Sequence, residues 1–326
     1  FLGLLVIAPA FHLSKEQVAE TFVEHHTHLN SARDLSEPTA LLSEARDELR
    51  EKFLVADVGI TGANFLIAET GTAMIVTNEG NGDLTQSLPP VHIALTSIEK
   101  VVPTLEDATL LLRLLARTAT GQEQTVYNTF FTGPKRDGDP DGPQEYHVVL
   151  LDNGRSELLG SEFRDILRCI RCGACINHCP VYEVTSGHAY GWVYPGPMGS
   201  VLTPHFVGID EAHELPGAST FCGRCEEVCP VHIPLPDLLR KWRMRAFQKG
   251  HPHGLQRMAL KAWARLAQHP RLYRMAMSMA IGGLKMVAGK RGTFTTLMGA
   301  GGWTKTRDLP TPQGGTFQSR YKGGER

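Results

Sequence analysis

Acidic residues are missing from a long stretch near the C-terminus of this 326-residue chain, since no Asp or Glu occurs between Leu238 and Arg307. Residues 238–326 carry 18 Lys and Arg against 2 Asp and Glu, whereas residues 1–237 carry 15 against 32. The formal net charge of −1 hides this split. The pattern predicts that the basic segment contacts something negative: the acidic part of the same chain, a partner subunit, nucleic acid or an anionic membrane surface.

Cysteine is absent outside residues 169–229, where all 7 cysteines lie. An odd number at ligand-like spacing argues against a disulfide framework and predicts bound metal in a reducing compartment, which indicates the cytoplasm. Long hydrophobic runs are also missing, and no signal peptide is evident. The opening "FLGLLVIAPAF" is shorter than the roughly 20 residues that span a bilayer and lacks an initiator Met. We expect it to be an internal strand of a larger domain.

Up to about residue 152 the pattern alternates between helix and strand. Ser14 and Gln17 form a capping box before one predicted helix, Pro38 suits the first turn of another, and Thr104 and Gly121 bound a third. The strand candidates are "NFLIAE", "TAMIVTN", "VHIALTS", "QTVYNTFF" and "EYHVVLLDNG". This alternation predicts an α/β domain with a largely parallel sheet. The domain has no G-x-G-x-x-G opening a helix after its first strand, so no nucleotide site is predicted.

The next part of the chain has a different character. A Gly-, Pro-, His- and Tyr-rich stretch at about 180–218 is predicted to be too irregular to carry a core of its own. Helices are predicted after Pro230, and the last of them is expected to break at Gly282 and Gly283.

The cysteines form two related motifs. "CIRCGACINHCP" has the spacing C-x2-C-x2-C-x3-C-P of bacterial ferredoxins, and "STFCGRCEEVCP" repeats it with Ser219 in place of the first cysteine. In that run three close thiolates bind one cubane and the fourth crosses to the other cluster. The first cluster is therefore assigned to Cys169, Cys172, Cys175 and Cys229, and the second to Cys179, Cys222 and Cys225. Zinc is the alternative for paired C-x2-C units, but two overlapping runs that each end in C-P favour iron–sulfur clusters.

Ser219 leaves the fourth corner of the second cluster open to several interpretations. Its oxygen could bind iron, one iron could stay open to water or to a group from a partner, or the site could hold a [3Fe–4S] cluster. Alternatively, Ser219 only caps the next turn and a ligand such as His205 or His232 arrives from elsewhere. The sequence predicts two [4Fe–4S] clusters and leaves these alternatives open.

With these motifs the chain resembles the iron–sulfur B subunits of the bacterial lactate-utilisation (Lut) system. The stretches "HLSKEQVAETF", "GITGANFLIAETGTAMIVTNEGNGDLTQSLPPVHIA" and "EYHVVLLDNGR", the seven-cysteine set and "GGWTKTRDLPTP" carry the resemblance. It implies a Rossmann-like LUD domain, similar to CoA transferases and sugar-phosphate isomerases, over residues 1–155. A helical dicluster ferredoxin-like domain over 156–250 and a basic helical region over 251–326 follow. The family has a further N-terminal stretch that this chain lacks, so the α/β domain is expected to be incomplete.

The resemblance also suggests a pocket, because loops at strand ends bind small anions in such folds. Four residues of "AETGTA" and three beyond it are the candidates for a small carboxylate ligand: Glu69, Thr70, Gly71, Thr72, Glu79, Asn81 and His92. The alternative is that Glu69 and Asn81 only fix turns and that His92 is a hydrogen-bonded strand histidine.

The function implied by the resemblance is electron transfer within a complex that oxidises L-lactate to pyruvate. Its partners would be the other lactate-utilisation subunits, one of them also an iron–sulfur protein, and electrons would continue to the respiratory chain. Another 2-hydroxy-acid oxidase, or a small-molecule-binding protein with redox-sensing clusters, are the alternatives. Whether the chain is itself an enzyme stays open. For the basic region we expect a subunit contact or a peripheral membrane contact through partners, and no nucleic acid.

Overall fold

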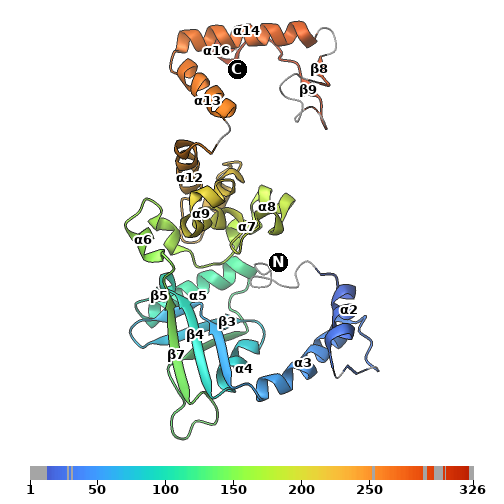
Figure 1. Ribbon diagram of the computed structural model, residues 1–326, viewed down its shortest axis with the longest axis vertical. Helices are drawn as coiled ribbons and strands as arrows, with labels where there is room; N and C mark the ends of the chain where they lie inside the picture. The colour runs from blue at the N-terminus through green and yellow to red at the C-terminus, as the bar shows by residue number, and fades with distance from the viewer. Residues whose placement is uncertain are drawn as a thin grey trace. The chain divides into compact units, whose positions relative to one another are not determined.

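The computed structural model describes residues 13–27, 29–30, 32–251, 254–288, 292–296, 304 and 306–322. The chain divides into two compact units, one up to Gln248 and one from Lys249 onward, which are described separately (Figure 1). In these described ranges no helix combines the length and the apolar character needed to cross a membrane. The apolar opening segment lies outside the described residues.

Two helices precede the sheets, α2 (Lys15–His25) and α3 (Pro38–Leu54). Ser14 accepts a hydrogen bond from the Gln17 backbone N–H, and the Gln17 side chain accepts one from the Ser14 N–H, so the predicted capping box is confirmed. Pro38 lies in the first turn of α3, where a missing N–H costs nothing.

The strands form two sheets. The first is parallel with the order β1–β4–β7, and its strands are Val58–Gly62, Val91–Ser97 and Glu145–Leu151. The second has the order β5–β2–β3–β6, and its strands are Val101–Val102, Phe65–Ile67, Thr72–Thr77 and Tyr127–Phe131. The predicted largely parallel sheet is thus confirmed for the first sheet. The second sheet is mixed, because β2 pairs parallel with β5 whereas β3 pairs antiparallel with both β2 and β6.

The two sheets and helix α5 (Leu105–Thr120) form layers. His92, Phe131 and Tyr146 meet edge to face between the sheets, and α5 packs on the other side of the second sheet through Leu112 and its neighbours. The predicted bounds of α5 are confirmed, with Thr104 as N-cap and Gly121 in the left-handed region. Helix α4 (Asn81–Ser87) contacts β1 and β4.

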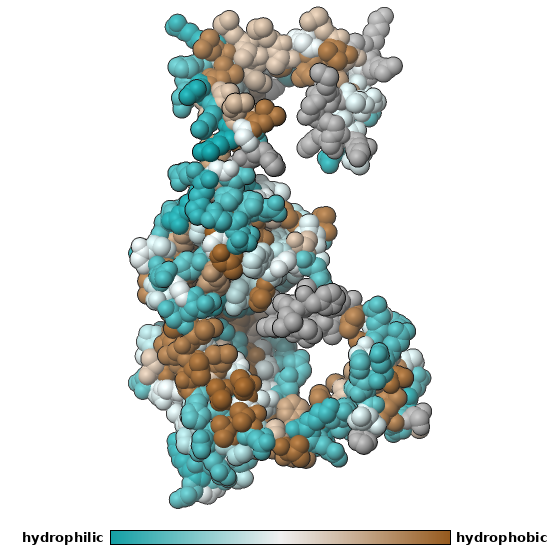
Figure 2. All heavy atoms as spheres, in the orientation of Figure 1, coloured by the Kyte–Doolittle hydropathy of each residue, from teal (hydrophilic) through white to brown (hydrophobic). Residues whose placement is uncertain are grey.

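The outer face of the parallel sheet is apolar and exposed. Figure 2 shows apolar side chains gathered over the β4 and β7 part of the surface, and the exposed set includes Val58, Ile60, Leu95, Val149 and Leu151. Parallel sheets are ordinarily covered on both faces, so this face is unusual.

Short helices surround the cysteines. They are α6 (Arg155–Leu159), η2 (Arg164–Arg168), α7 (Ala174–Asn177), α8 (Pro180–Thr185), η3 (His188–Tyr190), α9 (Gly196–Val207), α10 (Ile209–Ala212), η4 (Leu215–Gly217), α11 (Arg224–Glu227) and α12 (Leu235–Lys249). The 3-10 helix η1 (Ile98–Lys100) lies between β4 and β5 and contacts α6.

The prediction of an irregular, coreless stretch at 180–218 is wrong. Helix α9 is the centre of a core, because Met198, Val201 and Leu202 pack with Leu238 and Trp242 of α12. The indole Nε1 of Trp242 donates to the Val201 carbonyl at 2.8 Å. Glycine makes this packing possible: a Cβ at Gly199 would lie 1.6 Å from the carbonyl oxygen of Tyr194.

The second unit contains α13 (Gly254–Ala267), α14 (Pro270–Ala288), the short strands β8 (Thr293–Phe294) and β9 (Leu309–Pro310), and α16 (Phe317–Lys322). Helices α13 and α14 pack against each other. The predicted break at Gly282 and Gly283 is wrong, since α14 continues through both residues. A glycine costs a helix only about 1 kcal/mol, which the turns on either side offset.

Candidate metal centre

The two cysteine loops share one backbone conformation. The residue before the second motif position has a positive φ in both loops, 63° at Arg171 and 54° at Phe221. Gly173 and Gly223 follow with φ of 79° and 83° and cap the short helices α7 and α11. Left-handed residues in such turns direct successive N–H groups to one side, which suits sulfur and anions. Ser219 therefore occupies the backbone position that Cys169 has in the first loop.

Backbone N–H groups hydrogen-bond to the cysteine sulfurs in a repeated way. The N–H of Ala174 bonds to Cys172, and the N–H of Arg224 bonds to Cys222 at the equivalent place. The N–H of Ile233 donates to Cys229 Sγ at 3.4 Å. Hydrogen bonds of this kind are among the factors that set the potential of a bound cluster.

Ser219 repeats a contact of Cys169. The Arg171 N–H bonds to Cys169, and the Phe221 N–H donates to Ser219 Oγ at 3.2 Å. The capping bond of Ser219 is thus the counterpart of a cysteine contact, so it does not distinguish a turn cap from a ligand. His205 Nε2 donates a hydrogen bond to the Gly154 carbonyl at 2.7 Å, and neither His205 nor His232 lines the two cysteine cavities.

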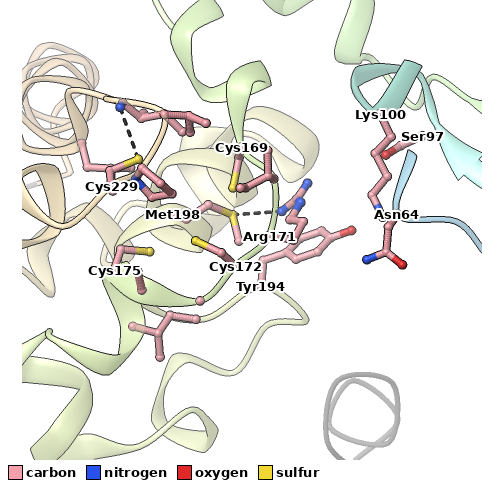
Figure 3. Close-up of a pocket in the computed structure, with 18 of the residues that line it drawn as sticks. Asn64, Ser97, Lys100, Cys169, Arg171, Cys172, Cys175, Tyr194, Met198 and Cys229 are labelled. Carbon is pink, nitrogen blue, oxygen red and sulfur yellow. Dashed lines mark hydrogen bonds between the residues drawn. The ribbon is translucent and has the colours of Figure 1, made fainter. Parts of the chain in front are cut away.

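The first cysteine cavity has a volume of about 720 Å³. Four thiols line it, three from the first loop and one from the second: Cys169, Cys172, Cys175 and Cys229. Figure 3 shows these four side chains together, with Met198 beside them. Cys172 and Ile170 also pack on the apolar core of the α/β domain, so the cavity lies where that domain meets the cysteine loops.

The second cysteine cavity encloses only about 20 Å³. Its lining includes Cys179 from the first loop, Cys222 and Cys225 from the second, and Ser219. Cys222 is exposed, whereas Cys179 and Cys225 are buried. The structure thus separates the seven thiols into the same two sets that the motif spacing predicts, and each loop contributes one thiol to the cavity of the other.

The donor chemistry fits iron–sulfur clusters. Thiolates are the soft ligands that such clusters use, and N–H groups already point at the sulfurs. Burial raises the pKa of Cys169 and Cys172, raises that of Cys175 to about 12 and that of Cys225 to about 11. Hydrogen bonds from Arg224 and Thr220 lower the pKa of Cys222. Within the described ranges, no three His, Cys, Asp or Glu side chains converge as the ligands of a single metal ion do.

A buried ion network ties the first loop to the α/β domain. Glu99 follows β4 and accepts hydrogen bonds from Arg171 Nη2 at 3.0 Å and from Arg155 Nε at 3.2 Å. The side chains of Glu99 and Arg155 are each only 3% exposed. The Arg171 guanidinium lies 4.6 Å from the centroid of the Tyr194 ring, and its Nη1 lies 3.0 Å from Met198 Sδ.

The structure does not gather the seven residues of the predicted carboxylate pocket around either cysteine cavity. Glu69, Thr70 and Gly71 form the β2–β3 turn, and Thr72 begins β3, where its hydroxyl bonds to those of Thr70 and Thr132. Glu79 precedes α4, and Asn81 begins that helix.

The Asn81 side chain accepts the N–H of Gly82. His92 is buried between the sheets and hydrogen-bonded to Thr61 at 2.8 Å. The contact of Asn81 corresponds to the alternative that this residue only fixes a turn, and the contact of His92 to the alternative of a hydrogen-bonded strand histidine.

Three family models match the chain: the LUD domain over residues 2–151, the 4Fe-4S dicluster domain over 165–233, and "Lactate utilisation protein B, C-terminal" over 236–325. A lactate utilization protein B of Bacillus velezensis is 43% identical over 329 residues, covering 98% of this chain and 67% of the relative. The chain belongs to the lactate utilisation protein B family. Its dicluster match also makes it an iron–sulfur protein, in agreement with the sequence-based prediction.

Other members of the lactate utilisation protein B family are equally similar. That of Shouchella clausii is 44% identical over 318 residues, and the match covers 97% of this chain but 66% of the relative, so the chain spans slightly less than two thirds of that length. A solved structure of a DUF162 family protein from Deinococcus radiodurans matches 31% of this chain and 56% of its own, at 22% identity and a TM-score of 0.25.

Replacing Ser219 with cysteine is expected to complete the thiol set of the second cavity, because the backbone there already has the Cys169 conformation. The EPR spectrum and midpoint potential of the second centre should shift toward those of a four-thiolate cubane. Ser219→Ala is the matched control, since it removes the oxygen and adds no sulfur. An unchanged spectrum and potential in Ser219→Cys would contradict a ligand position at residue 219.

Proposed function

We propose that this chain is the iron–sulfur electron-transfer subunit of a complex that oxidises L-lactate to pyruvate. The observation that carries the proposal is the interleaving of the loops, since Cys229 joins the first cavity and Cys179 the second. The residues assigned as ligands are Cys169, Cys172, Cys175 and Cys229 for one [4Fe–4S] cluster, and Cys179, Cys222 and Cys225 with Ser219 at the fourth corner for the other. We retain the division into domains at 1–155, 156–250 and 251–326 as part of the proposal.

Two bound clusters supply two one-electron carriers, which matches the two electrons that separate a 2-hydroxy acid from its 2-oxo acid. The two thiol sets differ in their surroundings. The first thiol set, in which Cys229 is buried and the other three are half-buried, lies against the α/β domain, and the exposed Cys222 brings the second set to the surface. This arrangement supports transfer between a site inside the chain and a partner docked beside the second loop.

The partner contact is assigned to the basic C-terminal region as well. Helices α13 and α14 contain Arg257, Lys261, Arg265, Arg271, Arg274 and Lys285 and no acidic residue. They also expose Leu255, Met258, Trp263, Met275 and Met279. An apolar surface rimmed by cations suits an acidic protein surface, so the partner is proposed to be another subunit of the lactate-utilisation system.

The experiment that tests this function is anaerobic reduction of the purified chain. We expect iron and inorganic sulfide in the protein, and L-lactate should reduce its EPR-detectable clusters only when the partner subunits are present. Raising the salt concentration should slow the reduction, because charge steers the contact.

The proposal would be overturned in favour of a redox sensor by two results together. Lactate and the partner subunits would fail to reduce the clusters, and oxygen would disassemble the clusters with a change in ligand binding. D-lactate and glycolate are tested in parallel. Reduction of the clusters by one of these acids in place of L-lactate would identify the complex as another 2-hydroxy-acid oxidase.

A further inference from the structure

The first cysteine cavity has a second, polar lobe that the thiols do not explain. In the view of Figure 3, Asn64, Ser97 and Lys100 lie across the cavity from the four cysteines, with Arg171 and Tyr194 between. All five line the same cavity. We propose that this lobe binds the carboxylate of a small 2-hydroxy or 2-oxo acid, a step that rests on the proposed function and locates its substrate.

The position within the fold supports a ligand site. Asn64 follows the end of β1, Ser97 ends β4, and Leu151 ends β7, so the lobe lies at the carboxyl ends of all three parallel strands. Ligands of open α/β sheets bind in the crevice at this edge. The residues that the sequence suggested, on the β2–β3 turn and around α4, lie elsewhere.

The charge of the lining favours an anion. Lys100, Arg155 and Arg171 line the cavity, and none of the described lining residues is Asp or Glu. Glu99 lies behind the two arginines and pairs with both, which leaves the ammonium of Lys100 as the cation of the polar lobe. Among the residues that the structure describes, Lys100 Nζ donates one hydrogen bond, to the Ala63 carbonyl at 2.7 Å. An ammonium has three N–H donors, so this bond orients it and leaves others for a ligand.

The test measures binding of L-lactate and pyruvate to the anaerobic, cluster-loaded chain by ligand-detected NMR, with neutral lactamide as the probe that lacks a carboxylate. Lys100→Met should weaken binding of both acids about 10- to 100-fold, as expected for loss of one charge-assisted hydrogen bond. Its iron content should not change. Lys52→Met is the matched control, because Lys52 lies on α3 and pairs with Glu48.

A second measurement does not depend on any variant. With [13C]lactate, pulsed EPR of the reduced wild-type chain should detect carbon coupled to the first cluster, assigned to Cys169, Cys172, Cys175 and Cys229. Absence of coupling, or unchanged lactate binding in Lys100→Met together with a shifted cluster potential, would overturn the site and make Lys100 a counter-charge to the cluster only. Binding that persists in a chain that lactate cannot reduce even with the partner subunits present would instead refute the proposed function and leave the site standing.

Discussion

Replacing Cys172 with alanine is expected to remove one cluster and leave the other. Cys172 lines only the first cavity, and the N–H of Ala174 already points at its sulfur. Alanine is preferred to serine because a serine hydroxyl could replace the thiolate as a ligand of iron. The variant should lose about half of the iron and sulfide of the wild type, since two similar clusters share the total.

Cys222→Ala is the matched comparison, because Cys222 holds the equivalent place in the second loop. Each variant should retain the EPR signal that the other loses, and neither should support reduction by lactate and the partner subunits. Iron, sulfide and both EPR signals at wild-type levels in Cys172→Ala would disprove the ligand assignment. Stoichiometric zinc without sulfide in the wild type would disprove the cluster assignment altogether.

Replacing Glu99 with alanine is expected to be the most destabilising change in the α/β domain. It leaves the buried Arg155 and the partly buried Arg171 without their shared carboxylate. Removal of one partner from a buried ion network costs about 3 to 5 kcal/mol of the free energy of unfolding. Urea unfolding followed by circular dichroism measures the loss. Glu162→Ala breaks an exposed pair with Arg245 and should cost less than about 1 kcal/mol.

The Glu99 carboxylate is also expected to make the stability of the protein depend on pH. Burial raises the pKa of Glu99, but hydrogen bonds from its backbone and from Ser97, with the charges of Arg155 and Arg171, outweigh burial and hold the pKa below 4.5. Stability from a lowered pKa is fully present above the unfolded value and is lost as the pH falls through the folded value. The wild type should therefore lose stability below about pH 4.5. Glu99→Ala should lack this part of the decrease, and an equally steep acid limb in both proteins would contradict the role of Glu99.

Much of the local structure was predictable because local rules decide it. The capping box at Ser14, the proline start of α3 and the bounds of α5 follow from hydrogen bonding and steric limits within a few residues. The cysteine spacing groups the thiols in the same way as the linings of the two cavities, because a short loop limits which sulfurs can face one cavity.

The errors arose where distant contacts decide the structure. Helix α9 has glycine or proline at three of its first four positions and a further proline, Pro204, in its interior. Local propensity therefore argued against a core element. Its burial depends on α12, more than thirty residues later. The parallel and antiparallel sheets could not be separated either, because pairing of β3 with β6 is a long-range choice that short apolar runs do not reveal.

The polar lobe was missed for a related reason. Lys100 belongs to the ordinary-looking "IEK" after β4, and nothing in that tripeptide indicates that its ammonium faces a cysteine loop seventy residues later. The usable signal was topological. The residues that line the lobe lie at or just beyond the ends of β1, β4 and β7, whereas the glycine-rich turns at 69–72 and 79–81 are the more conspicuous feature of the sequence.

The shared conformation of the two cysteine loops has a further consequence. Arg243 of α12 donates to the carbonyls of Pro216, Gly217 and Ser219 and stacks on Phe221 at 4.2 Å. The second turn is thus clamped from outside and keeps its shape whichever atom, oxygen or sulfur, residue 219 carries. A protein built this way can make two neighbouring redox centres unequal by exchanging a single atom, with no refolding of the scaffold around it.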